Sequence, residues 1–399
     1  MCILPPCKVI YEKGQIYDFE KQFKLSTYRL IRAFKEVEDG RKKKGTRYEI
    51  ELILLILFGG ITAGYTTIQD CCLWGNAQKE FIHKRIYLVH GIPYDTTVSR
   101  ALKKLDIDSL ITAFRKWIEI MFGSQIDTVA SFDGKTMRGI STEEKVRHIV
   151  SLFSHNTKQI LNQVAVQEKE NEIPAAIRLL KGSNLKGMTL IGDALHTQKN
   201  TAEEILLHKA HYLLYVKKNQ RDLYDDIRLH LEQLKLNQTQ TDTATLTQQT
   251  SNRDITTTVT ISQDPQIIWK LQIKGWPEIA TIGKLERTGT RTEKGKKHDV
   301  QEIVYFITSN KTFTAADIGK HLRNHWSIEN NLHWQKDYNF QEDKQHLRTG
   351  NAPQVMTFLR SCCLTIFYLL SVHSIATTLH TLQMNQHLHR TFLTAVGIV

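Results

Sequence analysis

The sequence predicts an α/β fold in which a mixed β-sheet carries a β-rich insertion and follows an all-α N-terminal region. Apolar residues recur at helical spacing through residues 17–125. From about residue 128 the pattern changes to short β-type runs that alternate with helical ones, and a Thr- and Gln-rich stretch comes next. These changes divide the chain into a helical N-terminal domain at 1–125, the first part of the sheet core at 126–235, the insertion at 236–300 and a helical segment at 301–399.

Two apolar segments stand out near the ends of the chain, and both are predicted to be core helices. The run from Ile50 to Tyr65 contains Glu51, and the run from Val355 to Val372 contains Arg360. The first is shorter than the roughly 20 residues that a bilayer needs, and the second is interrupted by a charge. No membrane partner is therefore expected.

The order of the central elements predicts the type of sheet. Three strands are followed by alternating helices and strands, at residues 128–133, 147–154, 160–167, 173–181, 188–193, 198–209 and 211–216. This β-β-β-α-β-α-β order is that of the ribonuclease-H-like core. The first and fourth strands are adjacent in that fold, so Asp133 and Asp193, which end them, are expected to meet.

The insertion is predicted from alternating patterns of apolar and polar residues. Residues 255–261 and 267–273 are expected to be strands, and a basic hairpin is expected from Lys284 to Lys297. The run 303–308 is predicted to return to the core as a strand. Thr314 is then expected to cap a helix that continues toward Glu329.

Asp133, Asp193 and Glu329 form the candidate catalytic and metal-binding set. Two carboxylates at strand ends and one on a helix suit a pair of divalent metal ions, which can activate water and stabilise a leaving oxygen in phosphodiester chemistry. Strand-end aspartates can also be simple caps without chemistry. Glu342 and Asp343 are rivals to Glu329 for the third position.

Composition favours an anionic partner and a reducing compartment. The formal net charge is +12, which suits a polyphosphate partner, although general solubility is an alternative explanation. Four of the six cysteines form two adjacent pairs, Cys71–Cys72 and Cys362–Cys363, and no C-x-x-C motif occurs. Reduced thiols and a cytoplasmic, nucleoid-associated protein are expected. The first residues lack the apolar segment of a secretory signal.

Several segments resemble the H-repeat-associated, or As1-type, insertion-sequence transposases, which are bacterial DDE transposases. The resemblance is weak from about residue 25 and strong from 128 to about 370. The segments that carry it are Phe132-Asp-Gly-Lys-Thr-Met-Arg-Gly139, Gly192-Asp-Ala-Leu-His-Thr-Gln198, Tyr212-Leu-Leu-Tyr-Val-Lys-Lys-Asn-Gln220, Arg323-Asn-His-Trp-Ser-Ile-Glu-Asn-Asn-Leu-His-Trp334, Phe340-Gln-Glu-Asp343 and Asn351-Ala-Pro353.

This resemblance implies a ribonuclease-H-like fold, two Mg²⁺ or Mn²⁺ ions per active site, and catalytic roles for Asp133, Asp193 and Glu329. Double-stranded DNA would be the partner, at the element ends and at the target, with a homodimer assembled on it. Two departures stand out. His196 comes after the second acid in an unusual motif, and Leu322 and His325 occupy the Tyr and Arg positions of a signature found in the wider group.

Five residues near these acids are predicted to contact DNA, and each has an alternative. Lys135 and Arg138 would clamp a terminal phosphate, unless they form salt bridges to Glu342 or Asp343. For Arg323 a structural ion pair is equally possible, and Lys336 can be a plain surface lysine. His325 and His333 flank Glu329 at four-residue spacing on one helical face, as metal-site neighbours or DNA contacts rather than zinc ligands.

Recognition of the DNA sequence is assigned to the appended regions. The N-terminal helices carry a basic set, and so does the insertion: Arg100, Lys103, Lys104, Arg115, Lys116, Lys284, Arg287, Arg291, Lys294, Lys296 and Lys297. The N-terminal helices can instead simply brace the core. Trp326 and Trp334 are predicted to lie in the core, whereas Trp276 is a candidate for stacking on an unpaired base.

The predicted function is therefore transposition: binding of terminal inverted repeats, hydrolysis of a phosphodiester at each end, and transfer of the freed 3′ hydroxyl to target DNA. A metal-dependent nuclease without strand transfer is one alternative. The other is a catalytically dead or domesticated sequence-specific DNA-binding protein.

Overall fold

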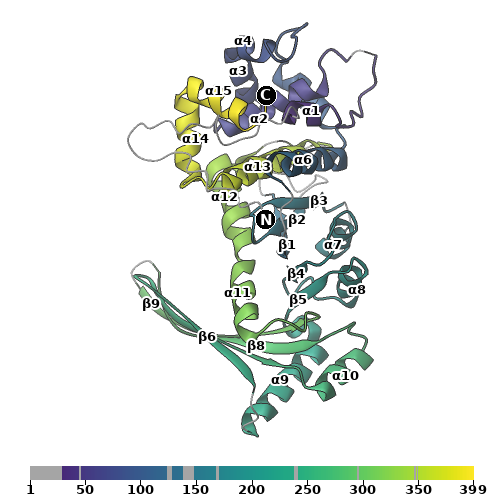
Figure 1. Ribbon diagram of the computed structural model, residues 1–399, viewed down its shortest axis with the longest axis vertical. Helices are drawn as coiled ribbons and strands as arrows, with labels where there is room; N and C mark the ends of the chain where they lie inside the picture. Colours follow the sequence, from purple (N-terminus) through teal and green to yellow (C-terminus); the bar gives the residue numbers. More distant parts are fainter. Residues whose placement is uncertain are drawn as a thin grey trace.

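The computed structural model describes residues 29–44, 46–123, 128–137, 148–167, 170–237, 241–293, 296–345, 347 and 349–399 (Figure 1). Its strands are β1 (Val129–Thr136), β2 (His148–Ser154), β3 (Ile160–Ala165), β4 (Thr189–Gly192), β5 (His211–Val216), β6 (Asp242–Thr250), β7 (Arg253–Ser262), β8 (Thr281–Glu293) and β9 (Lys296–Thr308). The five strands of the predicted core all form, close to their predicted bounds.

These strands form one mixed sheet of nine strands, in the order β3-β2-β1-β4-β5-β9-β8-β7-β6. The β1–β4 and β4–β5 pairs are parallel, and the other pairs are antiparallel. The first and fourth strands are neighbours, as their order predicted. The insertion does not form a separate sheet, because β9 continues from its hairpin directly into pairing with β5.

Helices cover the two faces of the sheet unequally (Figure 1). One face packs against four helices, α7 (Glu172–Lys181), α8 (Lys199–Leu207), α9 (Arg221–Leu236) and α10 (Pro265–Ile273). The other face packs against α11 (Ala315–His325) through Ala315, Ile318 and Leu322. Thr314 caps α11 in a capping box with Asp317, as predicted for Thr314.

The helices of the N-terminal region share one hydrophobic core with the C-terminal helices. The members are α1 (Leu30–Phe34), α2 (Ile50–Thr62), α3 (Ile68–Ala77), α4 (Lys79–His83), α5 (Asp95–Leu102), α6 (Ile107–Phe122), α13 (Ala352–Leu369), α14 (Ile375–Met384) and α15 (Gln386–Ala395). Hydrogen bonds from β3 join this helical body to the sheet edge. The Ile160 amide donates to Thr365 Oγ1, and Gln163 Nε2 donates to the Gln354 carbonyl, at 3.1 and 3.0 Å.

One segment of the insertion differs from its prediction. Residues 267–273 lie in α10 and not in a strand. Pro265 occupies the first helical turn and the Asp264 side chain accepts from the Gln266 amide, so capping outweighs the alternating pattern. The rest of the insertion is β-structure, and its longest strands, β8 and β9, project as an arm in Figure 1.

Within the described residues, no helix is both long and apolar enough to span a bilayer. The two apolar segments noted in the sequence are α2 and α13, and both are buried in the helical core.

His389 is a buried neutral group at the centre of that core. Its Nε2 lies 3.0 Å from Thr62 Oγ1, and its Nδ1 accepts from Trp74 Nε1 at 3.3 Å. The Thr62 hydroxyl donates to the Gly59 carbonyl, so the ring carries its proton on Nε2. Burial lowers the pKa of His389 to about 3.

We predict that this histidine makes the fold sensitive to acid. The unfolded chain takes up a proton near pH 6.5 and the folded chain does not, so stability falls as the pH drops from 6.5 toward 3. At pH 5 the loss amounts to roughly 2 kcal/mol. His389→Gln should flatten the dependence of the unfolding free energy on pH, measured by urea denaturation between pH 7 and 5. His380→Gln, in the exposed part of α14, is the control, and equal slopes in the two variants would refute the assignment.

Candidate active site

Asp133 and Asp193 come together where the parallel pairing of β1 and β4 ends. Asp193 directly follows β4, whereas β1 continues for three residues beyond Asp133 in antiparallel pairing with β2, so Asp133 does not end its strand as predicted. The β1–β4 register ends with Phe132 opposite Gly192, so each aspartate is the next residue of its chain. A Cβ on Gly192 would lie 2.6 Å from the Phe132 ring, so the glycine permits this close pairing. Asp193 is held by a tight turn in which its Oδ1 accepts from the amides of Leu195 and His196, at 2.9 and 3.2 Å.

Glu329 begins η3 (Glu329–His333), a single π-helical turn between α11 and α12 (Trp334–Phe340). Such turns insert one residue into a helix and are frequent at functional sites. His325 and His333 flank Glu329 as the sequence predicted. The negative charge of Asp193 acts on His325, and His333 Nδ1 lies 3.8 Å from Asp133 Oδ2. The helix therefore presents Glu329 and both histidines toward the aspartates.

The three acids form a region of uncompensated negative charge. Burial raises the pKa of Asp133 to about 7, and the neighbouring charges of Asp193, Glu329 and Glu172 add to the shift. Among the described residues, no lysine or arginine forms a salt bridge with Asp133, Asp193 or Glu329. Unpaired carboxylates that repel one another are the ligand chemistry that Mg²⁺ or Mn²⁺ prefers.

The described acids do not lie at metal-ligand distances from one another. In the parts of the chain that the structure describes, no three His, Cys, Asp or Glu side chains are close enough together to hold a metal ion. The acids are thus near enough to influence one another electrostatically but are not set at ligand distances. His196 lies buried beside them, 4.0 Å from Glu172, and both of its ring nitrogens lack a hydrogen-bond partner among the described residues.

Glu172 is a fourth acid at this site, and sequence reasoning missed it. It lies in the first turn of α7, and its carboxylate covers the backbone of Gly134, where a Cβ would be 2.3 Å from Glu172 Oε2. The glycine of the Asp-Gly-Lys motif is therefore required so that this carboxylate can approach Asp133. The sequence signal was indirect, since it consisted only of a glycine beside a strand-end aspartate.

His325 is a buried neutral side chain and not a cationic DNA contact. Its Nδ1 lies 2.8 Å from Ser131 Oγ, which also lies 2.6 Å from His155 Nε2. Burial lowers the pKa of His325 to about 4 and that of His155 to about 3. Through Ser131 these rings join α11 and the β2–β3 turn to β1, so the DNA contact predicted for His325 does not fit its position.

Lys135 and Lys336 belong to a buried charge network around Glu342. Lys135 Nζ is 2.8 Å from Glu342 Oε2 and also pairs with Asp337, while Lys336 Nζ lies at 3.4 Å and Arg360 at 3.7 Å from the Glu342 carboxylate. The predicted alternative of a Lys135–Glu342 salt bridge is confirmed. Lys336 is only 1% exposed, so it is not the plain surface lysine of the alternative interpretation.

The same network bears on the choice of the third acid. The Glu342 carboxylate is fully buried, and its pKa lies well below the usual range despite burial because Lys336, Lys135 and Arg360 surround it. A carboxylate that is already neutralised by three cations is a poor ligand for another one. Glu329 is exposed and has no such partner among the described residues, which favours it over Glu342.

The remaining predicted residues are placed as follows. Arg323 is exposed on α11, and Arg138 lies outside the described residues. Trp276 is 4% exposed within the core beside α10, so it is not free to stack on a base. The prediction that Trp326 and Trp334 lie in the core is wrong, because they are 45% and 53% exposed.

Comparison with known families gives the class of the protein. A family model described as "Transposase DDE domain" matches residues 124–366, and one described as "DDE_Tnp_1-associated" matches residues 31–118. The chain therefore belongs to the DDE transposase family, whose members cut and transfer DNA. The resemblance to H-repeat-associated transposases is confirmed.

Two of the relatives come from Escherichia coli. The "H repeat-associated putative transposase YhhI" of strain K12 is 25% identical over 335 residues, covering 83% of this chain and 88% of the relative. The "Putative transposase YncI" of strain O157:H7 is 26% identical over 347 residues, covering 86% and 88%. A structure of the piggyBac transposase synaptic complex with hairpin DNA aligns over 88% of this chain and 76% of that chain. Its TM-score of 0.39 and 12% identity establish no shared fold.

We predict that Gly134 and Glu172 are coupled. Gly134→Ala should destabilise the fold by about 0.5–1 kcal/mol, because its Cβ would displace the Glu172 carboxylate, the flexible end of that side chain. Glu172→Ala removes that carboxylate, so the double variant should recover stability relative to Gly134→Ala alone. A double-mutant cycle from urea denaturation measures this interaction. Strictly additive effects would mean that the two residues do not touch.

We predict that Glu342 acts in folding and not in chemistry. Glu342→Gln leaves three buried cations without their shared partner and should cost about 3–5 kcal/mol of unfolding free energy. The control is Glu232→Gln, which disrupts the exposed pair with Arg228 and should cost less than about 1 kcal/mol. A Glu342→Gln protein as stable as the control would show that the network does not stabilise the fold.

Proposed function

We propose that the protein is a DNA transposase that binds the terminal inverted repeats of an insertion element, cleaves the phosphodiester at each end and joins the freed 3′ end to target DNA. The observation that carries the proposal is the pair of aspartates where the parallel pairing of β1 and β4 ends. Glu329 lies near enough for its charge to act on Asp133, and none of the three acids has a salt-bridged lysine or arginine among the described residues. The strand order and the helix that carries the third acid support a ribonuclease-H-like core.

In this proposal Asp133, Asp193 and Glu329 hold two Mg²⁺ or Mn²⁺ ions. When bound, such a pair lowers the pKa of a water nucleophile and stabilises the leaving oxygen of an in-line displacement. The pairing of β1 with β4 holds the two aspartates side by side. The π-helical turn η3 carries Glu329 close enough for its charge to act on Asp133. His325 and His155, both neutral, hold α11 against β1 through Ser131. Glu172 adds negative charge beside Asp133, which favours cation binding.

DNA recognition is proposed for exposed basic residues on the helical body and the arm. Arg100, Lys103 and Lys104 are exposed at the end of α5, and Lys296 and Lys297 are exposed on β9. Other members of the predicted sets already have acidic partners, namely Lys116 with Glu36, Lys284 with Glu286 and Arg287 with Glu302. Lys294 lies outside the described residues. The proposal includes a homodimer on DNA, in which one subunit binds an end that the other cuts.

The shared core of the helical body affects how recognition can be tested. Deletion of residues 1–125 would remove α1–α6, which pack against α13–α15, and would expose the hydrophobic core that they share. Charge-reversing substitutions at Arg100 or Lys297 leave that core intact, so they test recognition without unfolding the protein.

The central test separates catalysis from binding. Asp133→Asn and Glu329→Gln should each lower cleavage of a labelled element end at least about 100-fold in Mg²⁺, because each removes a metal-binding carboxylate. Binding of the same DNA should persist, since it rests on lysine and arginine contacts to phosphates. The measurements are gel-resolved cleavage and fluorescence anisotropy at fixed salt, with Asp343→Asn as the matched acid control.

The outcomes distinguish the candidate functions. Loss of cleavage in both variants, together with end-to-target joining by the wild type, supports a transposase. Cleavage without joining would indicate a nuclease, and specific binding without cleavage would indicate a DNA-binding protein that has lost activity. Cleavage at the wild-type rate by Asp133→Asn would overturn the assignment of the acids.

A further inference from the structure

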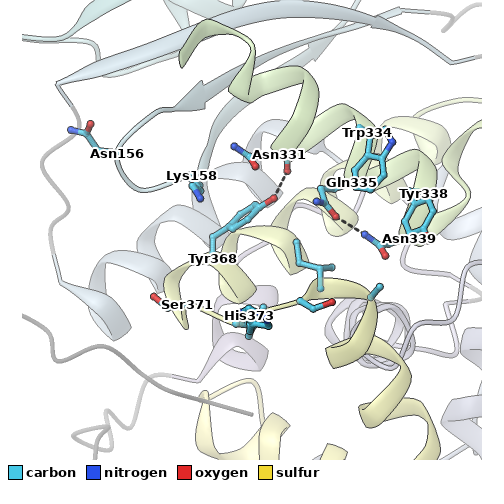
Figure 2. Close-up of a pocket in the computed structure, with 14 residues that line it drawn as sticks. Asn156, Lys158, Asn331, Trp334, Gln335, Tyr338, Asn339, Tyr368, Ser371 and His373 are labelled. Carbon is cyan, nitrogen blue, oxygen red and sulfur yellow. Dashed lines mark hydrogen bonds between the residues drawn. The ribbon is translucent and has the colours of Figure 1, made fainter. Parts of the chain in front are cut away.

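A cavity of about 910 Å³ lies between η3–α12 and the C-terminal end of α13 (Figure 2). Its volume falls within the roughly 300–1,000 Å³ typical of ligand pockets. Five of its lining residues follow helical spacing on one face of η3–α12: Asn331, Trp334, Gln335, Tyr338 and Asn339. The same helix carries Glu329 and His333, which adjoin Asp133, so one element bears both the third acid and a wall of this cavity.

The cavity contains an exposed aromatic platform. The rings of Trp334 and Tyr338 are stacked, with centroids 4.7 Å apart and planes 10° from parallel. These side chains are 53% and 63% exposed. Two large rings held parallel in solvent present a flat apolar face on which a planar group can stack, and such a face costs free energy when it is left in water.

The other lining residues supply polar and positive groups. Asn339 Nδ2 donates to Gln335 Oε1 at 2.5 Å, which uses one group of each amide and leaves a donor and an acceptor for a base edge. Lys158 reaches in from the β2–β3 turn, with its Nζ 5.2 Å from the Tyr368 ring centre. The Tyr368 hydroxyl donates to the Asn331 carbonyl at 2.7 Å and so fixes this wall (Figure 2). Among the described residues, no aspartate or glutamate lines the cavity.

We propose that this cavity binds an unpaired nucleotide of the DNA strand that is being cut, with its base stacked on an outer face of the Trp334–Tyr338 pair and its phosphate near Lys158. The inference rests on the proposed function. The base supplies the planar face, and its edge can form hydrogen bonds with the amides of Gln335 or Asn339. The phosphate of the nucleotide complements the positive charge of Lys158. Glu329 and the cavity lie on different faces of the same helix, η3–α12. A DNA strand that leaves the acids can therefore reach the cavity within a few nucleotides.

This proposal replaces the stacking role that the sequence suggested for Trp276. That side chain is enclosed by the core beside α10, whereas Trp334, expected in the core, is the exposed one. Extraction of a base from the duplex requires unstacking, which costs a few kcal/mol and is smallest where the strand is already unpaired. The cavity is therefore expected to prefer DNA ends with single-stranded nucleotides.

The test compares two fluorescein-labelled duplexes of one sequence, one blunt and one with a short unpaired thymidine tail. Anisotropy titrations at fixed salt give the affinity of wild type, Trp334→Ala, Trp334→Phe and Trp269→Ala for each. Trp269 is the matched control, because it is 66% exposed on α10 and does not line the cavity. Wild type and Trp269→Ala should prefer the tailed duplex by roughly 5- to 150-fold. Trp334→Ala should lose that preference, and Trp334→Phe should keep most of it.

Equal affinity of the wild type for the two duplexes, or a tail preference that survives Trp334→Ala, would overturn the cavity proposal and leave the transposase proposal standing. If the wild-type protein bound neither duplex, the proposed transposase function would be contradicted instead. Circular dichroism checks that Trp334→Ala folds, and Tyr338→Ala provides a second variant of the same platform. Tailed DNA should also quench tryptophan fluorescence more in the wild type than in Trp334→Phe, and equal quenching would count against stacking.

Discussion

The buried carboxylate of Glu342 connects the three elements on which the site depends. Lys135 lies two residues after Asp133 on β1, Lys336 lies on α12 seven residues after Glu329, and Arg360 lies in the middle of α13. Their ion pairs with one carboxylate fix the strand, the helix that carries Glu329 and the helical body relative to one another. Burial lowers the pKa of Lys336 to about 8, so the network is held against a substantial desolvation cost.

Charge is segregated around this network. On one side a single acid is surrounded by cations, and on the other Asp133, Asp193, Glu329 and Glu172 have no salt-bridged lysine or arginine among the described residues. Burial raises the pKa of Asp133 to about 7, and the charges of the neighbouring carboxylates add to the shift. In the proposed function these carboxylates would bind the cations, and neutralisation by an internal lysine or arginine would prevent that.

Most of the sheet was predictable from the sequence because local patterns specify it. A two-residue alternation, or a short apolar run that ends in aspartate, is a property of the strand itself, so β1 to β5 and the pairing of β1 with β4 could be inferred from order alone. Residues 267–273 were misassigned because an Asp-Pro cap outweighs alternation. Glu172 could not be found, since its position depends on α7 packing over a glycine 38 residues earlier (172 − 134).

One physical cause accounts for the errors from Trp334 onward on the helix that carries Glu329, and it does not explain the exposure of Trp326, which lies upstream. Predicting which side chains face the core assumes a regular 3.6-residue period, but the π-helical turn at Glu329–His333 inserts a residue and shifts the phase of the next helical turns. Trp334 and Tyr338 are thereby carried to the exposed face, while His333 and Lys336 are turned inward. Burial of a lysine was also unforeseeable, because its partner Glu342 approaches through tertiary packing.

The same turn explains why Glu329 can be positioned independently of the aspartates. Upstream of it, α11 packs on the sheet through Ile318 and Leu322; downstream, Leu332 and Phe340 belong to the core of the helical body. Glu329 thus lies where one helix passes from the sheet to the helical body, and its distance from Asp133 depends on how these two bodies dock.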